Sequence, residues 1–424
     1  MRPRATVSGE LCCNPRGNVR DRPDLEGKDA SMEFEDLEQQ RQEGLETARK
    51  KPAAAASSGE MTLRERFLRT MHYQHVDRLP NFEFGYWENT LRNWHKQGLP
   101  ERVVDEGTAY EYFGIETSHG APISVGIRAF LRDEVIEETE DKIVTRDALG
   151  IVSEINKHGN RSIPHYLDYP IKDRRTWQPY KESLLDNSNR YPEDWDQIAE
   201  RYRRRDYPLG IGYGSLIGTA RNLIGFENTA LFVCTDPELM EDIVETFCVS
   251  SLQTIERALQ DVAFDYAAGW EDICFNSGPV VGVPFFRDVL TSRYRRITEM
   301  LNLHGVDIVL TDCDGNLTPI AGCLLDGGVN TLFPAEVHGG TDPVGLRRTY
   351  GRQLRVWGGV DKMIFLKDRA AVDRELERLR PAIEEGGFIP TVDHRVQADA
   401  SLDLYKHYLD RKREWFNVGG EPKY

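Results

Sequence analysis

The feature that most constrains the fold is a regular alternation of short apolar runs with longer amphipathic segments after residue 205. The segments between the runs, such as 237–261, 284–305 and 368–387, carry apolar residues at i, i+3 and i+4, as amphipathic helices do. The runs are YPLGIGYG (207–214), AFDYAAGW (263–270), VDIVLTD (306–312), VNTLFPAE (329–336), LRVWGGVD (354–361) and GFIPTVDH (387–394). Strands that alternate with helices predict right-handed βαβ units and a parallel sheet.

Two earlier stretches add to this strand count. They are RLPNFEFGYW (78–87) and an Ile/Val-rich stretch around 121–156. With the six runs they give about eight strands, which favours an α/β fold of the (β/α)₈ TIM-barrel type over an open, doubly wound sheet. The segment 121–200 is less regular, and we interpret it as an insertion or lid.

The first 60 residues differ from the rest of the chain. Charged residues, Gly, Pro, Ala and Ser dominate them, and large apolar residues are too few to offset the entropy of an ordered chain. Met61 then opens an amphipathic pattern, MTLRERFLRTMHY. We therefore expect 1–60 to be a disordered, low-complexity extension and 61–424 to be the folded barrel.

Charge and cysteine content narrow the functional classes. The chain has 54 Lys and Arg against 70 Asp and Glu, a formal net charge of −16. This acidic balance argues against nucleic acid or an anionic membrane as a partner, because both attract basic surfaces. No apolar run is long enough to span a bilayer. The seven cysteines include no closely spaced C-x-x-C pair, which is typical of reduced thiols in the cytoplasm.

Polar side chains follow the predicted strands at their carboxyl ends, where barrel enzymes place their chemistry. Glu271 and Asp272 follow one run directly, and His394 follows the last. Asp312 and Asp314 are two residues apart, so both can point the same way while Cys313 points away. Carboxylates with an imidazole suit zinc, iron or manganese. We therefore predict a divalent metal site formed by Asp312, Asp314, His394 and Glu271.

Simpler roles exist for several of these residues. An aspartate at the end of a strand is often the N-cap of the next helix, and Asp361 and Asp314 are open to that reading. Glu336 is equally compatible with a structural ion pair, and His394 with a hydrogen-bonded interior histidine. The D-x-D pair taken together with His394 is harder to explain in this way.

Aromatic residues near the strand ends suggest a pocket wall for a small substrate. These are Tyr86, Trp87, Tyr213 and Trp270, although core packing also explains each one singly. The run GIGYGSLIG (210–218) lacks the spacing of a phosphate-binding loop. Its glycines instead indicate close approach of a ligand to the backbone, or a bulged strand. We also expect Glu336 and Asp361 to orient the substrate.

Several blocks of the sequence resemble the uroporphyrinogen decarboxylase superfamily, a group of (β/α)₈ barrels. MTLRERFLRTMHYQHVDRLP (61–80) is similar to the usual start of these proteins, with an Asp-Arg-x-Pro step into the first strand. Similar blocks follow in order over roughly 61–415: GSLIGTARNLIGFENTALFVCTDPELMEDIV, WEDICFNSGPVVGVPFFRDVLTSRYRRI, HGVDIVLTDCDGN and GGFIPTVDHRVQADASLDLY.

The superfamily has two functional branches, and the resemblance implies a different chemistry for each. True uroporphyrinogen decarboxylases act on a tetrapyrrole without a cofactor and carry a closely spaced arginine pair after strand one. Here NFEFGYWENTLRNW supplies one arginine, Arg92. In cobamide-dependent methyltransferases, zinc is held by His-x-Cys on one strand and by Cys on the last. Asp312-x-Asp314 resembles the first position, and His394 falls at or next to the second.

The resemblance therefore implies methyl transfer between a small methylated substrate or pterin and a corrinoid carried by a partner protein. Asp312, Asp314 and His394 would bind a divalent metal, with zinc the first expectation, and Glu271 would be the fourth ligand or the acid/base. The catalytic residues would be Glu271 and His394. Tetrapyrrole decarboxylation without a cofactor is the alternative, in which His394 would hold a propionate. A non-catalytic corrinoid or porphyrin binder is a third interpretation. A homodimer is compatible with each of them.

Overall fold

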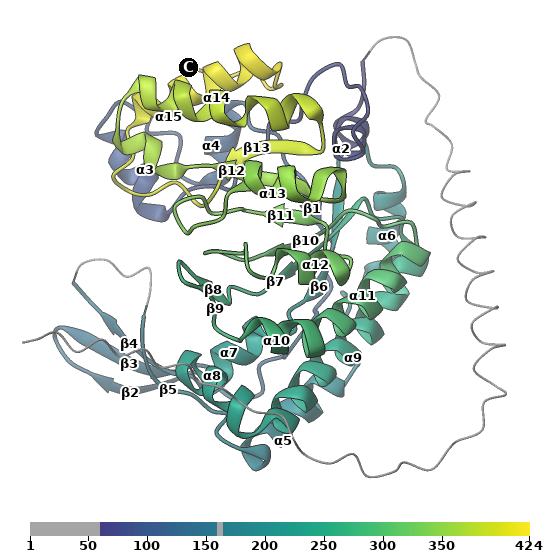
Figure 1. Cartoon of the computed structure of the whole chain (residues 1–424). Coiled ribbons are helices and arrows are strands. Elements are labelled where there is room, and N and C mark those ends of the chain that lie inside the picture. The colour runs from purple at the N-terminus through teal and green to yellow at the C-terminus, as the bar shows by residue number, and fades with distance from the viewer. Residues whose placement is uncertain (1–59, 159–163) are drawn as a thin grey trace, which may run out of the picture. The chain divides into compact units, whose positions relative to one another are not determined.

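The computed structural model describes residues 60–158 and 164–424. The predicted disordered extension lies outside the described residues, apart from Glu60. Within the described part, the predicted alternation of strands and helices is present (Figure 1).

Seven parallel strands form the main sheet, in the order β1-β6-β7-β10-β11-β12-β13. From β6 onward each strand pairs with the next strand of this sheet along the chain, as successive βαβ units require. All six predicted apolar runs contain one of these strands. The strands are β1 (His119–Gly120), β6 (Leu209–Gly214), β7 (Tyr266–Trp270), β10 (Val309–Asp312), β11 (Thr331–Phe333), β12 (Arg355–Val360) and β13 (Phe388–Val392).

Helices follow the strands of this sheet. The longest, α9 (Pro237–Asp261), begins where Asp236 accepts a hydrogen bond from the Leu239 N–H at 3.1 Å and Pro237 takes the first helical position. The other helices after β6 are α7 (Gly218–Ile224), α8 (Phe226–Thr235), α10 (Val283–Phe285), α11 (Thr291–Leu303), α12 (Ala321–Asp326), α13 (Pro343–Tyr350), α14 (Arg369–Glu385) and α15 (Leu402–Phe416). Short π or 3₁₀ turns are η1 (Phe286–Leu290), η2 (Gly351–Gln353) and η3 (Lys362–Leu366).

The structure does not contain the predicted strand near residue 80, so a full eight-stranded barrel is not formed among the described residues. Residues 79–86 instead make two isolated bridges, Leu79 to Val418 and Tyr86 to Val396. Pro80 has no N–H to give to a ladder. The N–H of Val392 on the edge strand β13 donates to the Glu83 carboxylate at 3.0 Å. A side chain therefore takes the place of a strand carbonyl at this edge.

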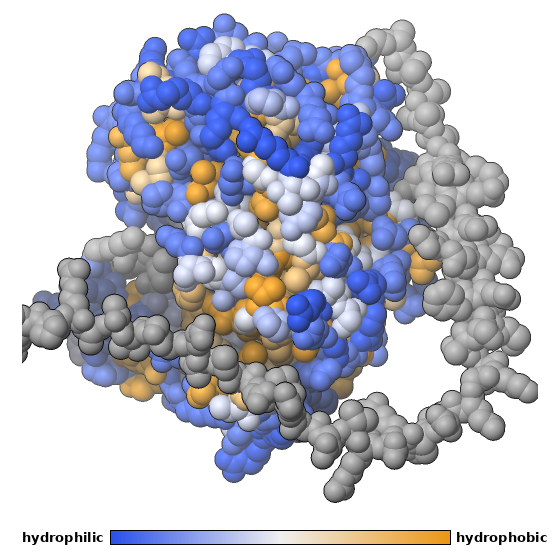
Figure 2. Space-filling model, viewed as in Figure 1, coloured by the Kyte–Doolittle hydropathy of each residue, from blue (hydrophilic) through white to orange (hydrophobic). Residues whose placement is uncertain are grey.

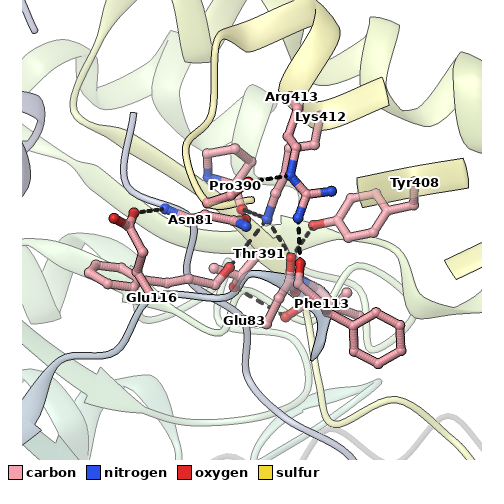
Figure 3. A network of polar contacts seen from close by, with 12 residues as sticks. Asn81, Glu83, Phe113, Glu116, Pro390, Thr391, Tyr408, Lys412 and Arg413 are labelled. Carbon is pink, nitrogen blue, oxygen red and sulfur yellow. Dashed lines mark hydrogen bonds and ion pairs between the residues drawn. The ribbon is translucent and has the colours of Figure 1, made fainter. Parts of the chain in front are cut away.

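Glu83 anchors this segment through a buried ion pair (Figure 3). Its carboxylate contacts the Lys412 ammonium of α15, and both side chains are 1% exposed or less. Tyr408 donates to the same carboxylate at 2.8 Å, and Lys412 donates to the Pro390 carbonyl at 3.2 Å. Burial lowers the pKa of Lys412, against the opposing charge of Glu83. The network ties residues 79–86 to β13 and α15 without strand pairing.

A hydrophobic cluster lies toward the amino ends of the barrel strands. Phe67 of α2 (Leu63–Met71) lies against Tyr266, which begins β7, and against Trp357 in β12, with ring centroids 5.5 and 5.4 Å apart. The other buried members of this cluster are Met71, Phe82, Ile308, Leu310 and Ile389. The interior is therefore filled by side chains at one end, which leaves the carboxyl ends of the strands for polar groups.

The irregular segment 121–200 contains a separate antiparallel sheet, of order β2-β3-β4-β5, that lies outside the main sheet (Figure 1). The Ile/Val-rich stretch around 121–156, which the sequence pattern assigns to the barrel, forms most of it. Its strands are mostly exposed or half-buried, whereas the strands of a parallel barrel sheet are buried on both faces. Its elements are β2 (Glu134–Glu138), β3 (Lys142–Arg146), β4 (Val152–Asn156) and β5 (His165–Asp168). The remaining elements are α3 (Glu88–His95), α4 (Glu106–Phe113), α5 (Arg174–Leu185), α6 (Trp195–Arg203) and the hairpin β8 (Cys274–Phe275) with β9 (Gly278–Pro279).

The visible surface is mostly hydrophilic, with hydrophobic residues gathered over the part that holds α7, α8 and α10 (Figure 2). Leu231 and Phe275 are about half exposed. In the described ranges, no helix combines the length and the apolar character needed to cross a bilayer.

Candidate metal centre

Three aspartates meet where two neighbouring strands end. Asp312 is the last residue of β10 and lies opposite Trp270, the last residue of β7. Asp272 follows β7, and Asp314 follows β10. One carboxylate oxygen from each of the three lies within 4.8 Å of the others. We call Asp272, Asp312 and Asp314 the acid cluster.

The backbone around the acid cluster holds this geometry. The Glu271 N–H donates to the Asp312 carbonyl at 2.8 Å, which extends the pairing of β7 and β10 past the end of β7. Asp272 then adopts a φ of +44°, which turns the chain, and its Oδ1 accepts the Asp314 N–H at 3.2 Å. Gly315 follows at φ +81°, where a Cβ would come within 2.5 Å of the Cys274 carbonyl oxygen. Only glycine fits this close approach.

The acid cluster places three carboxylates close together in a partly buried position. Burial, together with the charges of Asp272 and Asp314, raises the pKa of Asp312 to about 8. Burial and the charge of Asp314 also raise the pKa of Asp272. The Asp314 Oδ1 is buried and has no hydrogen-bond partner within the described ranges. These residues fit a divalent cation, which would relieve the repulsion and coordinate the free oxygen.

His394 comes from the other edge of the sheet and reaches the acid cluster. Its Nε2 lies 3.2 Å from the Asp314 Oδ2. The rings of Phe84 and Trp87 lie against it, with centroid distances of 6.0 and 5.6 Å. Burial lowers the pKa of His394, but the hydrogen bond and charge of Asp314 outweigh burial, so the pKa lies above its usual value. The structure therefore brings Asp312, Asp314 and His394 together, and their role as metal ligands stays a prediction.

Glu271 is not in this group, and the prediction that it joins the metal ligands needs correction. Its buried carboxylate accepts the N–H groups of Leu216, Ile217 and Gly218 at 2.6–2.9 Å, and Tyr294 donates to it at 2.5 Å. It therefore holds the loop between β6 and α7. Asp272 takes the position in the cluster. The sequence alone does not show which of the two adjacent acids, Glu271 or Asp272, joins the cluster. The backbone turn at positive φ that separates their directions lies at Asp272 itself.

Asp393, Glu336 and Lys362 support the loops around the acid cluster. The buried Asp393 carboxylate accepts the N–H groups of Val337 at 2.7 Å and Lys362 at 2.9 Å, and burial raises its pKa to about 7. The Lys362 ammonium lies 2.9 Å from the Glu336 Oε1, and the other Glu336 oxygen accepts the Gly315 N–H at 2.9 Å. Asp361 caps η3 through the Met363 N–H at 2.9 Å. Glu336 and Asp361 thus have protein partners, and their substrate contacts stay predictions.

The four aromatic residues predicted to wall a pocket divide into two pairs. Tyr86 and Tyr213 are buried, and their hydroxyls bond to Tyr405 at 2.8 Å and to the Leu310 carbonyl at 2.9 Å. They therefore belong to the core. Trp87 is 36% exposed beside His394, and Trp270 lines a cavity.

A cavity of about 320 Å³ lies at the carboxyl ends of β6 and β7. Its lining includes Trp270 and glycines of β6, the strand at which we expect close approach of a ligand to the backbone. A Cβ at Gly212 would meet nothing within 4 Å. The lining residues are Ile123, Val125, Gly126, Gly212, Gly214, Ser215, Thr219, Ala268, Gly269 and Trp270.

Comparisons with known proteins give a structural likeness and no sequence match. No protein-family model matches the chain, and no curated protein matches it. Among solved structures, a methyltransferase from Methanosarcina mazei superposes with a TM-score of 0.53 at 14% sequence identity, over 84% of this chain and 100% of that one. At this identity the likeness concerns the fold alone, and it extends over the whole length of that methyltransferase.

Proposed function

We propose that this chain is a metal-dependent, methyltransferase-like enzyme of the uroporphyrinogen decarboxylase superfamily. It would move a methyl group between a small methylated substrate or pterin and a corrinoid held by a partner protein. The fold shared with a methyltransferase supports the reaction class. The observation that carries the proposal is the acid cluster, with its raised pKa values and the unpartnered Asp314 Oδ1.

The residues that would hold the metal are Asp272, Asp312 and Asp314, with His394 beside Asp314. Carboxylate oxygens and an imidazole suit zinc, iron or manganese, and zinc is the first candidate. When bound, the cation would act as a Lewis acid on the atom that gains or loses the methyl group.

The protein groups have separate tasks in this proposal. His394 orients Asp314 through the 3.2 Å contact of its Nε2, and its position lets it exchange a proton with a substrate atom at the same place. The rings of Phe84 and Trp87 restrict how the imidazole can turn. Trp270 and the glycines of β6 offer an apolar cavity for the body of a small substrate.

The direct test of the reaction combines the full chain, loaded with zinc, iron or manganese in turn, with reduced cobalamin and a panel of methyl ethers, methylamines and methyl thioethers. The methyl group leaves its heteroatom for Co(I), and the heteroatom takes up a proton. Formation of methylcobalamin, followed by its absorbance, is expected with the wild type and is expected to fall with Asp314→Ala. Asp399→Ala removes an exposed carboxylate and serves as the control. Methylcobalamin formation that is equal with Asp314→Ala, or absent for every donor and metal, contradicts the proposal.

A further inference from the structure

One buried arginine beside the acid cluster has no hydrogen-bonded or ion-paired partner among residues 60–158 and 164–424. Arg221 lies on α7 and is 9% exposed. Its Nε is buried without a hydrogen bond, and no ion pair or hydrogen bond of its guanidinium is found in the described ranges. Burial of the guanidinium costs free energy, which no direct hydrogen bond or ion pair offsets, and it lowers the pKa of Arg221 although the nearby charge of Asp272 acts in the opposite direction.

The other buried arginines show that this is exceptional. Each of them has a carboxylate or several carbonyl oxygens as partners: Arg66 with Asp77, Arg190 with five backbone carbonyls, Arg205 with Asp265, and Arg347 with Glu385.

Arg221 lies over two aromatic rings. Its guanidinium carbon lies 4.3 Å from the ring centroid of Phe226 and 5.4 Å from that of Trp270. Arg380 also lies over two rings, those of Trp415 and Phe416 at 4.9 and 5.4 Å, but it has Glu377 and Glu384 as partners. Stacking on two rings therefore does not by itself leave an arginine without a carboxylate.

The position of Arg221 joins it to the candidate site. Trp270, over which it lies, lines the cavity and precedes Asp272 by two residues. The charge of Arg221 opposes the rise in the pKa of Asp272. The start of α7 is fixed because Glu271 accepts the Gly218 N–H at 2.6 Å. The guanidinium is thus presented from a rigid element beside the acid cluster.

We propose that Arg221 binds the carboxylate of the substrate, so that the substrate class is a methylated carboxylic acid. A guanidinium pairs with a planar carboxylate through two parallel hydrogen bonds. A single charge is favoured over a phosphate dianion, because Arg221 is one cation and Asp272 and Asp312 lie nearby. The methyl-bearing end would then face the acid cluster. The methyl-transfer part of this inference rests on the proposed function, whereas carboxylate binding does not.

The test compares two ligands of nearly equal size, of which one is a carboxylate and the other its neutral amide, by titration calorimetry on the full metal-loaded chain. Methoxyacetate carries a methyl ether and a carboxylate, and methoxyacetamide is its neutral counterpart. The amide cannot form the buried, charge-assisted pair with Arg221. The wild type is therefore expected to bind methoxyacetate at least about tenfold more tightly than the amide. Arg221→Met is expected to abolish this preference and Arg221→Lys to weaken it. Arg380→Met, the matched arginine over two rings, is expected to keep it.

Equal or undetectable binding of the two ligands by the wild type overturns the inference, as does a preference that survives in Arg221→Met. If Arg221→Met fails to fold, which its thermal midpoint reveals, the weakened preference expected for Arg221→Lys gives the comparison in its place. The metal content of the same samples is measured in parallel. The protein could bind no metal and transfer no methyl group, yet still prefer the carboxylate in a way that depends on Arg221. That result would support the carboxylate site and refute the proposed reaction.

Discussion

Most substitutions of buried residues destabilise a protein, but the raised pKa of Asp312 predicts that a substitution there stabilises the metal-free protein. In the folded protein this pKa is about 8, against 3.8 for the free side chain. The folded state therefore binds a proton more tightly than the unfolded state, and stability is lost as pH rises from about 4 to about 8. Asp312→Asn removes the charge and nearly conserves the volume. Metal-free Asp312→Asn is therefore expected to be more stable than the wild type at neutral pH.

The expected gain in stability for Asp312→Asn follows from the size of the pKa shift of Asp312. Each pKa unit corresponds to about 1.4 kcal/mol, and between 3.8 and pH 7 the charge of Asp312 costs about 4 kcal/mol. A proton shared among the three carboxylates relieves part of this cost, so we expect a gain of about 2–4 kcal/mol for Asp312→Asn. For a folded unit of this size the gain corresponds to a rise of about 3–5 °C in the thermal midpoint.

The assay is differential scanning calorimetry of chelator-treated full chain at pH 5, 6 and 7. The gain from Asp312→Asn should grow with pH over this range. Asp399→Asn, which changes an exposed carboxylate, should leave the midpoint within about 1 °C of the wild type. A metal-free Asp312→Asn protein that is less stable than the wild type at pH 7, or a difference that does not change with pH, would refute the reasoning.

Two further predictions concern the closure of the fold. Glu83→Gln leaves Lys412 buried without its counter-charge and should lower the free energy of unfolding by about 3–5 kcal/mol, measured by urea denaturation. The double variant Glu83→Gln/Lys412→Met should lose less than the sum of the two single changes, and additive losses would show that the pair is not coupled. Arg66 lowers the pKa of Asp77 to about 2, so the stability from this pair is present above pH 4 and is lost as pH falls through about 2. The acid side of the stability curve, followed by circular dichroism, should be flatter in Asp77→Asn, and an unchanged curve would exclude this contribution.

The strands from β6 onward can be predicted from the sequence, because each one lies in an apolar run that is followed by helical segments. The start of the sheet was not readable in this way. NFEFGYW has the alternation of a strand, yet Glu83 pairs with Lys412, more than 300 residues away, and the segment joins the sheet through side chains. Local periodicity carries no information about such a distant partner.

Some residues of the candidate site could also be predicted from the sequence, and others could not. Asp312 and Asp314 share a face because side chains alternate along a strand, and His394 follows the last strand; all three could be named in advance. Asp272 could not be distinguished from Glu271, since the choice depends on a residue at positive φ and on three N–H groups that bind Glu271. Arg221 had no sequence signal at all, because only the structure reveals a buried charge without a partner.

The central claim is that the acid cluster holds a divalent cation. It is tested most directly by elemental mass spectrometry of the full chain, purified without chelator, beside the Asp314→Ala/His394→Ala variant and the Asp399→Ala control. We predict close to one equivalent of zinc, iron or manganese in the wild type and in Asp399→Ala, and its loss in the double variant. Equal metal content in all three proteins, or no metal in the wild type even after reconstitution, would contradict the account.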